Sequence, residues 1–281
     1  MKRLHPIAYP IAERVTAFST TRHGGISTGN YASMNITHYC GDDAEAVLEN
    51  RRRLASWLGI DEKRIVLPRQ THQTEVRLID ETNYRSTDFL EGVDALVTTT
   101  PDICIGISTA DCIPIIIYDR ARHAAAAIHA GWRGTVARIA QKTIRQMEQW
   151  CGSNPESLHA VIGPGISLEA FEVGDEVYDA FRQAGFQMDS LAKRFPASDV
   201  TENTSSERGI KENTSSERSL KEKWHIDLPE CNRQQLTACG IPAENIHLSR
   251  ICTYTDCHTF FSARRLGIHS GRIFTGIMLH P

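Results

Sequence analysis

A cysteine and a histidine lie at the two outer ends of a predicted β-hairpin in the middle of the chain. Cys112 precedes the apolar run IPIIIY, His129 ends the run HAAAAIH, and the polar segment DRAR separates the two runs. If residues 120 and 121 form a two-residue turn, antiparallel pairing places Cys112 directly opposite His129. Opposed residues lie on one face of the sheet with Cβ atoms about 4.5–5.5 Å apart. A thiolate and an imidazole at that separation can share one metal ion, since Zn–S and Zn–N bonds are about 2.0–2.3 Å long.

Two other interpretations of this pair remain open from the residues alone. Cys112 could act as a nucleophile with His129 as its base, which requires the same proximity and no metal. The pair could also be structural, as a buried thiol beside a hydrogen-bonded histidine at a strand end. The surroundings favour a functional site, because Asp111 is adjacent to Cys112 and the segment GWRG follows His129. Active sites usually form where polar residues and glycines gather at the ends of buried strands.

The segments around this pair predict the elements that must position it. Three short apolar runs bounded by polar residues are typical of buried strands, namely residues 103–109, 113–118 and 123–129. In TVARIAQKTIRQMEQW, which follows, apolar residues recur at helical spacing, so we expect a helix packed on this sheet.

A second helix is predicted near the N-terminus. GDDAEAVLENRRRLASWLG has Asp42 or Asp43 as a candidate N-cap and Gly59 as a candidate end. Strands interspersed with helices predict mixed α and β layers. Because no linker separates two independent cores, we expect one domain over residues 1–281.

A polar repeat interrupts this pattern. Residues 202–208 and 212–218 both read ENTSSER, and the region at about 198–223 has almost no apolar residues. Few apolar side chains are available there to offset the entropy cost of ordering, so we expect a flexible surface insertion without a direct catalytic role.

Composition excludes several classes of protein. The 281 residues include 31 basic and 34 acidic ones, giving a formal net charge of −3, and 41% are hydrophobic, which is typical of a globular protein and not of a nucleic-acid binder. No apolar run approaches the roughly 18 residues of a membrane helix, and the N-terminal segment lacks the apolar core of a signal peptide, so we expect a cytoplasmic protein. The eight cysteines form no CxxC pair and the twelve histidines no HxH pair. The sequence therefore gives no support to a multicopper electron relay.

Several longer motifs, in this order, resemble those of the YfiH/PgeF-like family. The resemblance extends from about Phe18 to Arg272, and the family was named for laccase-like polyphenol oxidase activity and is described as purine nucleoside phosphorylases with adenosine deaminase activity. The motifs are FSTTRHGGIS, NYASMNITHYCGDD, RQTHQTEV, TADCIPIII, AAIHAGWRGT, IGPGIS with FEVGDEV, and CTYTDCHTFFSARR with GIHSGR.

The resemblance implies a fold and a metal centre. The implied fold is an α+β, four-layer α/β/β/α sandwich with mixed β-sheets. The implied cofactor is one ion per chain, zinc or copper, held by His72 of RQTHQ, Cys112 of ADCIP and His129 of IHAGWRG. Three protein ligands leave a fourth position for water, which is the pattern of a catalytic zinc site. His72 comes from the resemblance alone, whereas hairpin pairing also indicates the other two.

Phosphorolysis requires a site that holds phosphate against the sugar. Guanidinium groups and glycine-rich backbone amides suit that task, although each candidate also has a plain structural explanation. The candidates are Arg133 of GWRGT, Gly163 and Gly165 of the GPGIS turn, and Arg264 with Arg265 of FSARR. Asp111, Cys112 and Arg133 are the candidate catalytic residues, with Asp111 expected to orient groups or transfer a proton.

We therefore expect a metal-dependent purine nucleoside phosphorylase with adenosine deaminase activity. Its substrates would be adenosine, inosine and guanosine, with methylthioadenosine as a further candidate, cleaved by phosphate to base and ribose 1-phosphate. The alternatives are a copper-dependent, laccase-like polyphenol oxidase, a Cys/His hydrolase, and a peptidoglycan editing factor. The expected partners are small molecules, without nucleic acid or membrane, for a monomer or small homo-oligomer.

Overall fold

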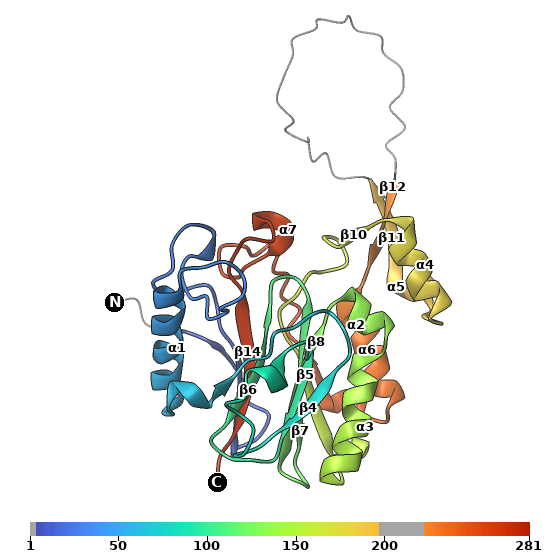
Figure 1. Cartoon of the computed structure of the whole chain (residues 1–281). Coiled ribbons are helices and arrows are strands. Elements are labelled where there is room, and N and C mark those ends of the chain that lie inside the picture. The colour runs from blue at the N-terminus through green and yellow to red at the C-terminus, as the bar shows by residue number, and fades with distance from the viewer. Residues whose placement is uncertain (1–3, 197–221) are drawn as a thin grey trace, which may run out of the picture.

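Two mixed β-sheets stack face to face and helices cover both outer faces (Figure 1). The structure, a computed structural model, describes residues 4–196 and 222–281. Within these residues the first sheet has the order β1 (Ile7–Tyr9), β2 (Val15–Ser19), β14 (Ile273–Leu279), β6 (Cys104–Thr109) and β3 (Ile65–Val66). The second has the order β13 (Ile246–Leu248), β9 (Leu158–Ile162), β7 (Ile113–Asp119), β8 (Ala124–Ala130), β5 (Ala95–Thr98) and β4 (Val76–Ile79).

The outer layers are helical. Helix α1 (Ala44–Leu58) lies on the first sheet, while α2 (Trp132–Val136), α3 (Ile139–Cys151) and α6 (Leu228–Ala238) lie on the second (Figure 1). Parallel and antiparallel pairs occur in both sheets, for example β3 with β6 and β14 with β6. The predicted α/β/β/α sandwich of mixed sheets is therefore confirmed.

Strand β7 shows how the core is divided. Its side chains alternate between two apolar layers, with Ile116 in the layer between the sheets and Ile115 and Ile117 in the layer under the helices. Both faces of the strand are buried, which explains why its sequence is a nearly continuous apolar run. Ile144 of α3 and Leu236 of α6 belong to the same outer layer.

The β7–β8 hairpin forms as predicted, but in a different register. Pro114 pairs with His129, and Asp119 pairs with Ala124, so residues 120–123 form a four-residue loop instead of a two-residue turn. The Asp119 carboxylate accepts hydrogen bonds from the backbone amides of Ala121 and Arg122, which stabilises the longer loop. The predicted direct pairing of Cys112 with His129 is therefore wrong. Because the register differs by two residues, both side chains still face the same side of the sheet.

The two predicted helices differ in how closely they match the structure. Helix α1 has Asp43 as its N-cap, whose side chain accepts a hydrogen bond from Ala46 N, and Gly59 ends it in the left-handed conformation with φ 73°. The segment expected as one helix after the hairpin, residues 135–150, instead begins at the end of α2 and continues as α3. Arg138, with φ 64°, separates them.

A smaller lobe lies above the second sheet. It contains the three-stranded sheet β10 (Glu172–Val173), β12 (Glu222–Ile226) and β11 (Ala192–Pro196), with α4 (Asp175–Gln183) and α5 (Met188–Leu191) beside it (Figure 1). Of the insertion predicted at about 198–223, Glu222 and Lys223 are described, and they belong to β12. The rest lies outside the described residues. Within the described part of the chain, no helix is long and apolar enough to cross a membrane.

Candidate metal centre

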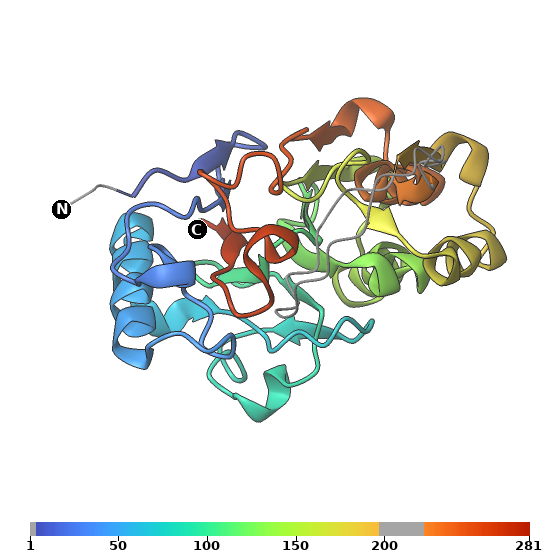
Figure 2. The ribbon, with the colours of Figure 1, turned by 90° about the horizontal axis from the view of Figure 1, so that it is seen from above.

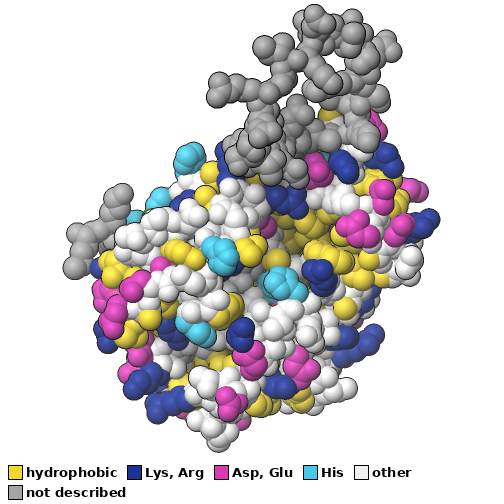
Figure 3. Space-filling view, turned by 45° about the horizontal axis from the view of Figure 1, so that its top comes forward, with side chains coloured by type: hydrophobic (Ala, Val, Ile, Leu, Met, Phe, Trp, Pro, Cys, Tyr) yellow, Lys and Arg dark blue, Asp and Glu magenta, His cyan; other side chains and the backbone are white. Residues whose placement is uncertain are grey.

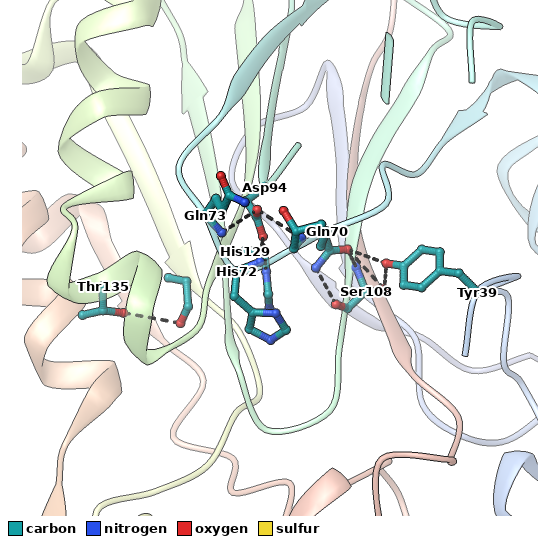
Figure 4. Close-up of polar contacts among 10 residues, drawn as sticks. Tyr39, Gln70, His72, Gln73, Asp94, Ser108, His129 and Thr135 are labelled. Atoms are coloured by element: carbon teal, nitrogen blue, oxygen red, sulfur yellow. Dashed lines mark hydrogen bonds and ion pairs between the residues drawn. The ribbon is translucent and has the colours of Figure 1, made fainter. Parts of the chain in front are cut away.

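The three predicted metal ligands converge at one end of the sandwich. His72 lies in the loop before β4, Cys112 directly precedes β7, and His129 is the penultimate residue of β8. One ligand atom from each side chain lies within 4.8 Å of the other two, and the described residues contain one such group of three. The two imidazole rings are 4.8 Å apart between centroids and meet edge to face. Figure 4 shows both rings at the same site.

A glycine provides the space for this close approach. Gly131 lies across the hairpin from Cys112, one residue beyond the end of β8. A Cβ atom at Gly131 would lie 3.0 Å from Cys112 Sγ and 3.1 Å from His72 Cδ2. A side chain at this position would therefore require Cys112 and His72 to shift by a few tenths of an ångström.

A buried carboxylate holds two of the ligands from behind. His129 Nδ1 lies 2.7 Å from Asp94 Oδ1, and Asp94 has no solvent exposure. The backbone amides of Thr71, His72 and Gln73 also donate to this carboxylate. Sequence reasoning missed Asp94, although a charged residue directly before the apolar strand ALVT was a signal for it.

The site favours a thiolate next to an imidazolium when no metal is bound. Burial raises the pKa of the Cys112 thiol, but the charge of His129 and hydrogen bonds from His129 and His72 outweigh it and lower the pKa to about 6. Burial lowers the pKa of His129, but the Cys112 thiolate and Asp94 outweigh it and raise the pKa to about 9. Opposite charges this close stabilise each other's charged form.

The donor set fits a transition metal. A thiolate is a soft ligand that zinc and copper bind well, and imidazole suits both ions. A ligand cysteine must be deprotonated, which the lowered pKa of Cys112 favours. His129 Nδ1 is engaged by Asp94, so Nε2 is the atom left for a metal.

A pocket of about 530 Å³ opens over the three ligands, a volume within the usual range for small-molecule sites. Tyr39, Gln70 and Ser108 form one side, and Ile166, Phe171 and Ile268 supply apolar surface. The other lining residues are His72, Thr109, Ala110, Asp111, Cys112, His129, Ala263, Arg264 and Arg272. Figure 3 shows histidine and hydrophobic side chains gathered on this face. Helix α7 (Ala263–Leu266) lies at the same end, red near the centre of Figure 2.

The structure brings some of the predicted anion-binding residues to the pocket. Arg264 lines it, and its guanidinium also donates to the backbone oxygen of Glu172. Arg133 lies outside the described lining, exposed, with its guanidinium 4.2 Å from the centre of the Trp132 ring. Arg265 likewise lies outside the described lining, over Tyr254.

The GPGIS turn uses its amides internally. Gly163 N donates to Pro114 O, and Gly165 N donates to Ile251 O. A Cβ atom at Gly165 would lie 2.4 Å from Ile113 Cδ1, so this glycine permits close packing against β7. These contacts give both glycines a structural role behind the metal ligands.

Asp111 connects the candidate metal centre to the pocket rim. Its Oδ1 accepts from the Thr253 hydroxyl and its Oδ2 accepts from the Arg264 backbone amide, both at 2.7 Å. Its backbone has φ 86°, and the next residue is the ligand Cys112. Asp111 therefore fixes the start of α7 relative to the thiol.

A second polar group in the lining also escaped sequence reasoning. Gln70 Nε2 donates to Ser108 O, and Ser108 N donates to Gln70 Oε1, each at 2.8 Å. Tyr39 OH lies 2.9 Å from Ser108 Oγ (Figure 4). These contacts fix the wall of the pocket that comes from the first sheet. Single polar residues from separate segments of the chain carry no sequence signal that would pair them.

Residues 16–280 match the family described as multi-copper polyphenol oxidoreductase laccase. The chain belongs to this family. A purine nucleoside phosphorylase from Bacteroides thetaiotaomicron is 46% identical over 271 residues, which cover 95% of this chain and 92% of that protein. Adenosine deaminase RL5, from an unknown prokaryotic organism, is 44% identical over 271 residues, covering 94% of each chain.

Solved structures of the family have the same fold. Bacillus licheniformis hypothetical protein YfiH is 31% identical with a TM-score of 0.81, and the match covers 94% of this chain and 92% of that one. The predicted membership of the YfiH-like family is therefore confirmed, and the chain is an enzyme of this family. Although the family is described as multi-copper, the described residues bring together one set of three metal-ligating side chains.

Proposed function

We propose that this protein is a metal-dependent purine nucleoside phosphorylase that also deaminates adenosine. The observation that carries the proposal is a nucleoside-sized pocket whose lining includes the His72–Cys112–His129 group. The names of the two relatives at 46% and 44% identity support the same pair of activities.

The three ligands would hold one zinc or copper ion in the lining of the pocket. When bound, the ion supplies Lewis acidity beside the substrate. Asp94 orients His129, and Gly131 leaves room for the ligands to approach. Phe171, Ile166 and Ile268 provide apolar surface for a purine ring.

Arg264 is our candidate for holding phosphate. Of the arginines predicted from the sequence, it is the one in the described pocket lining, and a guanidinium can bind phosphate through two parallel hydrogen bonds. Arg272 also lines the pocket, but its guanidinium donates to the backbone oxygens of Ile268, Ser270 and Gly271. Arg272 would therefore shape the rim.

Asp111 would act by orienting the rim. Both of its carboxylate oxygens already accept a hydrogen bond from the protein. Holding α7 near Cys112 keeps Arg264 over the pocket, which is how Asp111 would support catalysis. This role needs no proton transfer to or from the carboxylate.

The test is release of hypoxanthine from inosine by metal-loaded protein, with and without phosphate. We expect release to require phosphate and to yield ribose 1-phosphate. Arg264→Ala should reduce phosphorolysis roughly 10-fold to 150-fold, the equivalent of a charge-assisted hydrogen bond of about 1.5–3 kcal/mol. Adenosine deamination, which uses no phosphate, should decrease less.

Arg182→Ala is a matched control, since Arg182 is an exposed arginine on α4 paired with Asp179. It should leave both activities unchanged. Hypoxanthine release that is independent of phosphate would contradict phosphorolysis. Phenol oxidation without nucleoside turnover would instead support the oxidase named by the family.

One observation favours a second candidate, a Cys/His hydrolase. The lowered pKa of Cys112 and its proximity to His129 suit a nucleophile with its base. Activity that survives complete removal of metal would support this alternative. Activity that is lost with the metal and restored by zinc or copper would support the metal-dependent enzyme.

A further inference from the structure

We infer that Asp94 is a positioning residue that sets both the imidazole tautomer of His129 and the loop conformation of His72, and thereby determines metal affinity. The inference rests on the metal-binding part of the proposed function. It concerns how this chain prepares two of its three ligands before any ion binds.

The first observation is that the carboxylate is fully used. Oδ1 accepts from His72 N at 3.0 Å and lies 2.7 Å from His129 Nδ1. Oδ2 accepts from Gln73 N at 2.8 Å and from Thr71 N at 3.3 Å. A carboxylate has about four acceptor sites, and here four donors occupy them. A buried charge is tolerated when its hydrogen bonds are complete.

The second observation is that the two ligands depend on Asp94 in different ways. An ionised carboxylate only accepts hydrogen bonds, so His129 must carry a proton on Nδ1, which directs the lone pair of a neutral imidazole to Nε2. His72 depends on it through the backbone, because three successive amides of its loop point at the carboxylate. His72 itself has φ 62°, a left-handed conformation that a non-glycine residue adopts rarely without such support.

The third observation is the place of Asp94 in the sheet. It directly precedes β5, its backbone oxygen accepts from His129 N at 2.8 Å, and its backbone amide donates to Glu75 O. Main chain and side chain of one residue therefore connect the end of β8 with the segment that leads into β4. A carboxylate behind a ligating histidine typically changes metal affinity by about 10-fold to 100-fold.

The discriminating variant is Asp94→Asn, which keeps the shape and removes one acceptor oxygen. In one orientation the new amide group faces the N–H groups of Thr71 and Gln73, which disturbs the loop of His72. In the other orientation, the new amide group faces His72 N and donates to His129 Nδ1. The imidazole proton of His129 then moves to Nε2. Either orientation should lower zinc affinity.

The matched control is Asp119→Asn in the β7–β8 loop. Asp119 is also fully buried and accepts from two backbone amides, but it lies outside the described lining of the pocket. We expect chelator competition to show zinc affinity about 10-fold to 100-fold weaker for Asp94→Asn and unchanged for Asp119→Asn. In the cobalt-loaded protein, the thiolate-to-metal absorption should weaken in parallel. Wild-type zinc affinity in Asp94→Asn would overturn the inference.

A measurement on the wild-type chain keeps the inference testable if Asp94→Asn does not fold. Imidazole ¹⁵N NMR of the zinc-loaded protein should show a protonated, hydrogen-bonded Nδ1 and a coordinated Nε2 for His129. Coordination through Nδ1 would overturn the inference. A wild-type chain that binds no zinc would contradict the proposed function itself, and NMR of that chain would still decide the Asp94 hydrogen bond.

Discussion

The environment of Cys112 differs from that of the fully buried cysteines Cys104 and Cys231. Burial raises the pKa of Cys104, which has no solvent exposure, and of Cys231. Cys112 is half-buried, and two imidazoles face it and lower the pKa of its thiol. The same residue type is therefore an inert thiol in the core and a thiolate at the end of β7.

Alkylation of the metal-stripped protein should reveal this difference. The pKa of Cys112 is depressed, so its thiolate fraction, and hence its reaction with iodoacetamide, should decrease only as the pH falls below about 6. An ordinary thiol already loses its thiolate below about pH 8.5. Peptide mass spectrometry across pH 5–9 would measure the rate at Cys112, with buried Cys104 as the unreactive reference. His129→Gln should raise the midpoint of the pH dependence of alkylation at Cys112. A midpoint near that of free cysteine in both proteins would contradict the ion pair.

At the residue scale, contiguous motifs predicted which side chains come together. His72, Cys112 and His129 were predicted, and the structure brings them together. Asp94 was missed because its partners come from other segments of the chain. Arg133 was named for its place in GWRGT, yet α2 turns its side chain toward Trp132. Sequence position did not determine the direction of that side chain.

At the scale of elements, the hairpin shows that an error in the predicted strand register can leave the predicted site unchanged. The shortest turn was assumed, but Asp119 stabilises a longer loop, and the register moved by two residues. A shift of one residue would have placed Cys112 and His129 on opposite faces, whereas a shift of two keeps them together. Alternation along a strand is therefore a firmer guide to the site than turn length.

Helix α7 depends on Asp111, and two substitutions distinguish the possible roles of this residue. Asp111→Asn can keep both contacts, since its oxygen can accept from Arg264 N while its amide donates to the Thr253 hydroxyl. Asp111→Ala removes both. We expect Asp111→Asn to retain most phosphorolysis and Asp111→Ala to lose roughly 10-fold or more, because hydrogen bonds to a charged group contribute about 1.5–3 kcal/mol each. Initial rates with inosine would measure this. Equal, severe losses in both variants would favour proton transfer by Asp111.

At the scale of the whole molecule, the site lies where the chain crosses between the two sheets. Strand β6 belongs to the first sheet and β7 to the second, and residues 110–112 connect them. The pocket therefore has one wall from each sheet and a rim from α7. Apolar runs predicted three buried strands on one sheet, but this grouping is wrong, because β6 belongs to the first sheet and β7 and β8 belong to the second. Local patterns do not encode which strands become neighbours.

Metal binding should stabilise the whole molecule, because the ligands join the loop before β4 to the ends of β7 and β8. An ion at 100 times its dissociation constant stabilises the folded state by about 2.7 kcal/mol. For a chain of this size that corresponds to a rise in Tm of about 5–10 °C. Differential scanning fluorimetry of wild-type protein with zinc and with a chelator should show this difference. Cys112→Ser should show little or no difference in Tm, because it replaces a soft thiolate with a weak neutral ligand. Equal Tm values for the zinc-loaded and chelator-treated wild type would mean that the three side chains do not form a metal site in the folded protein.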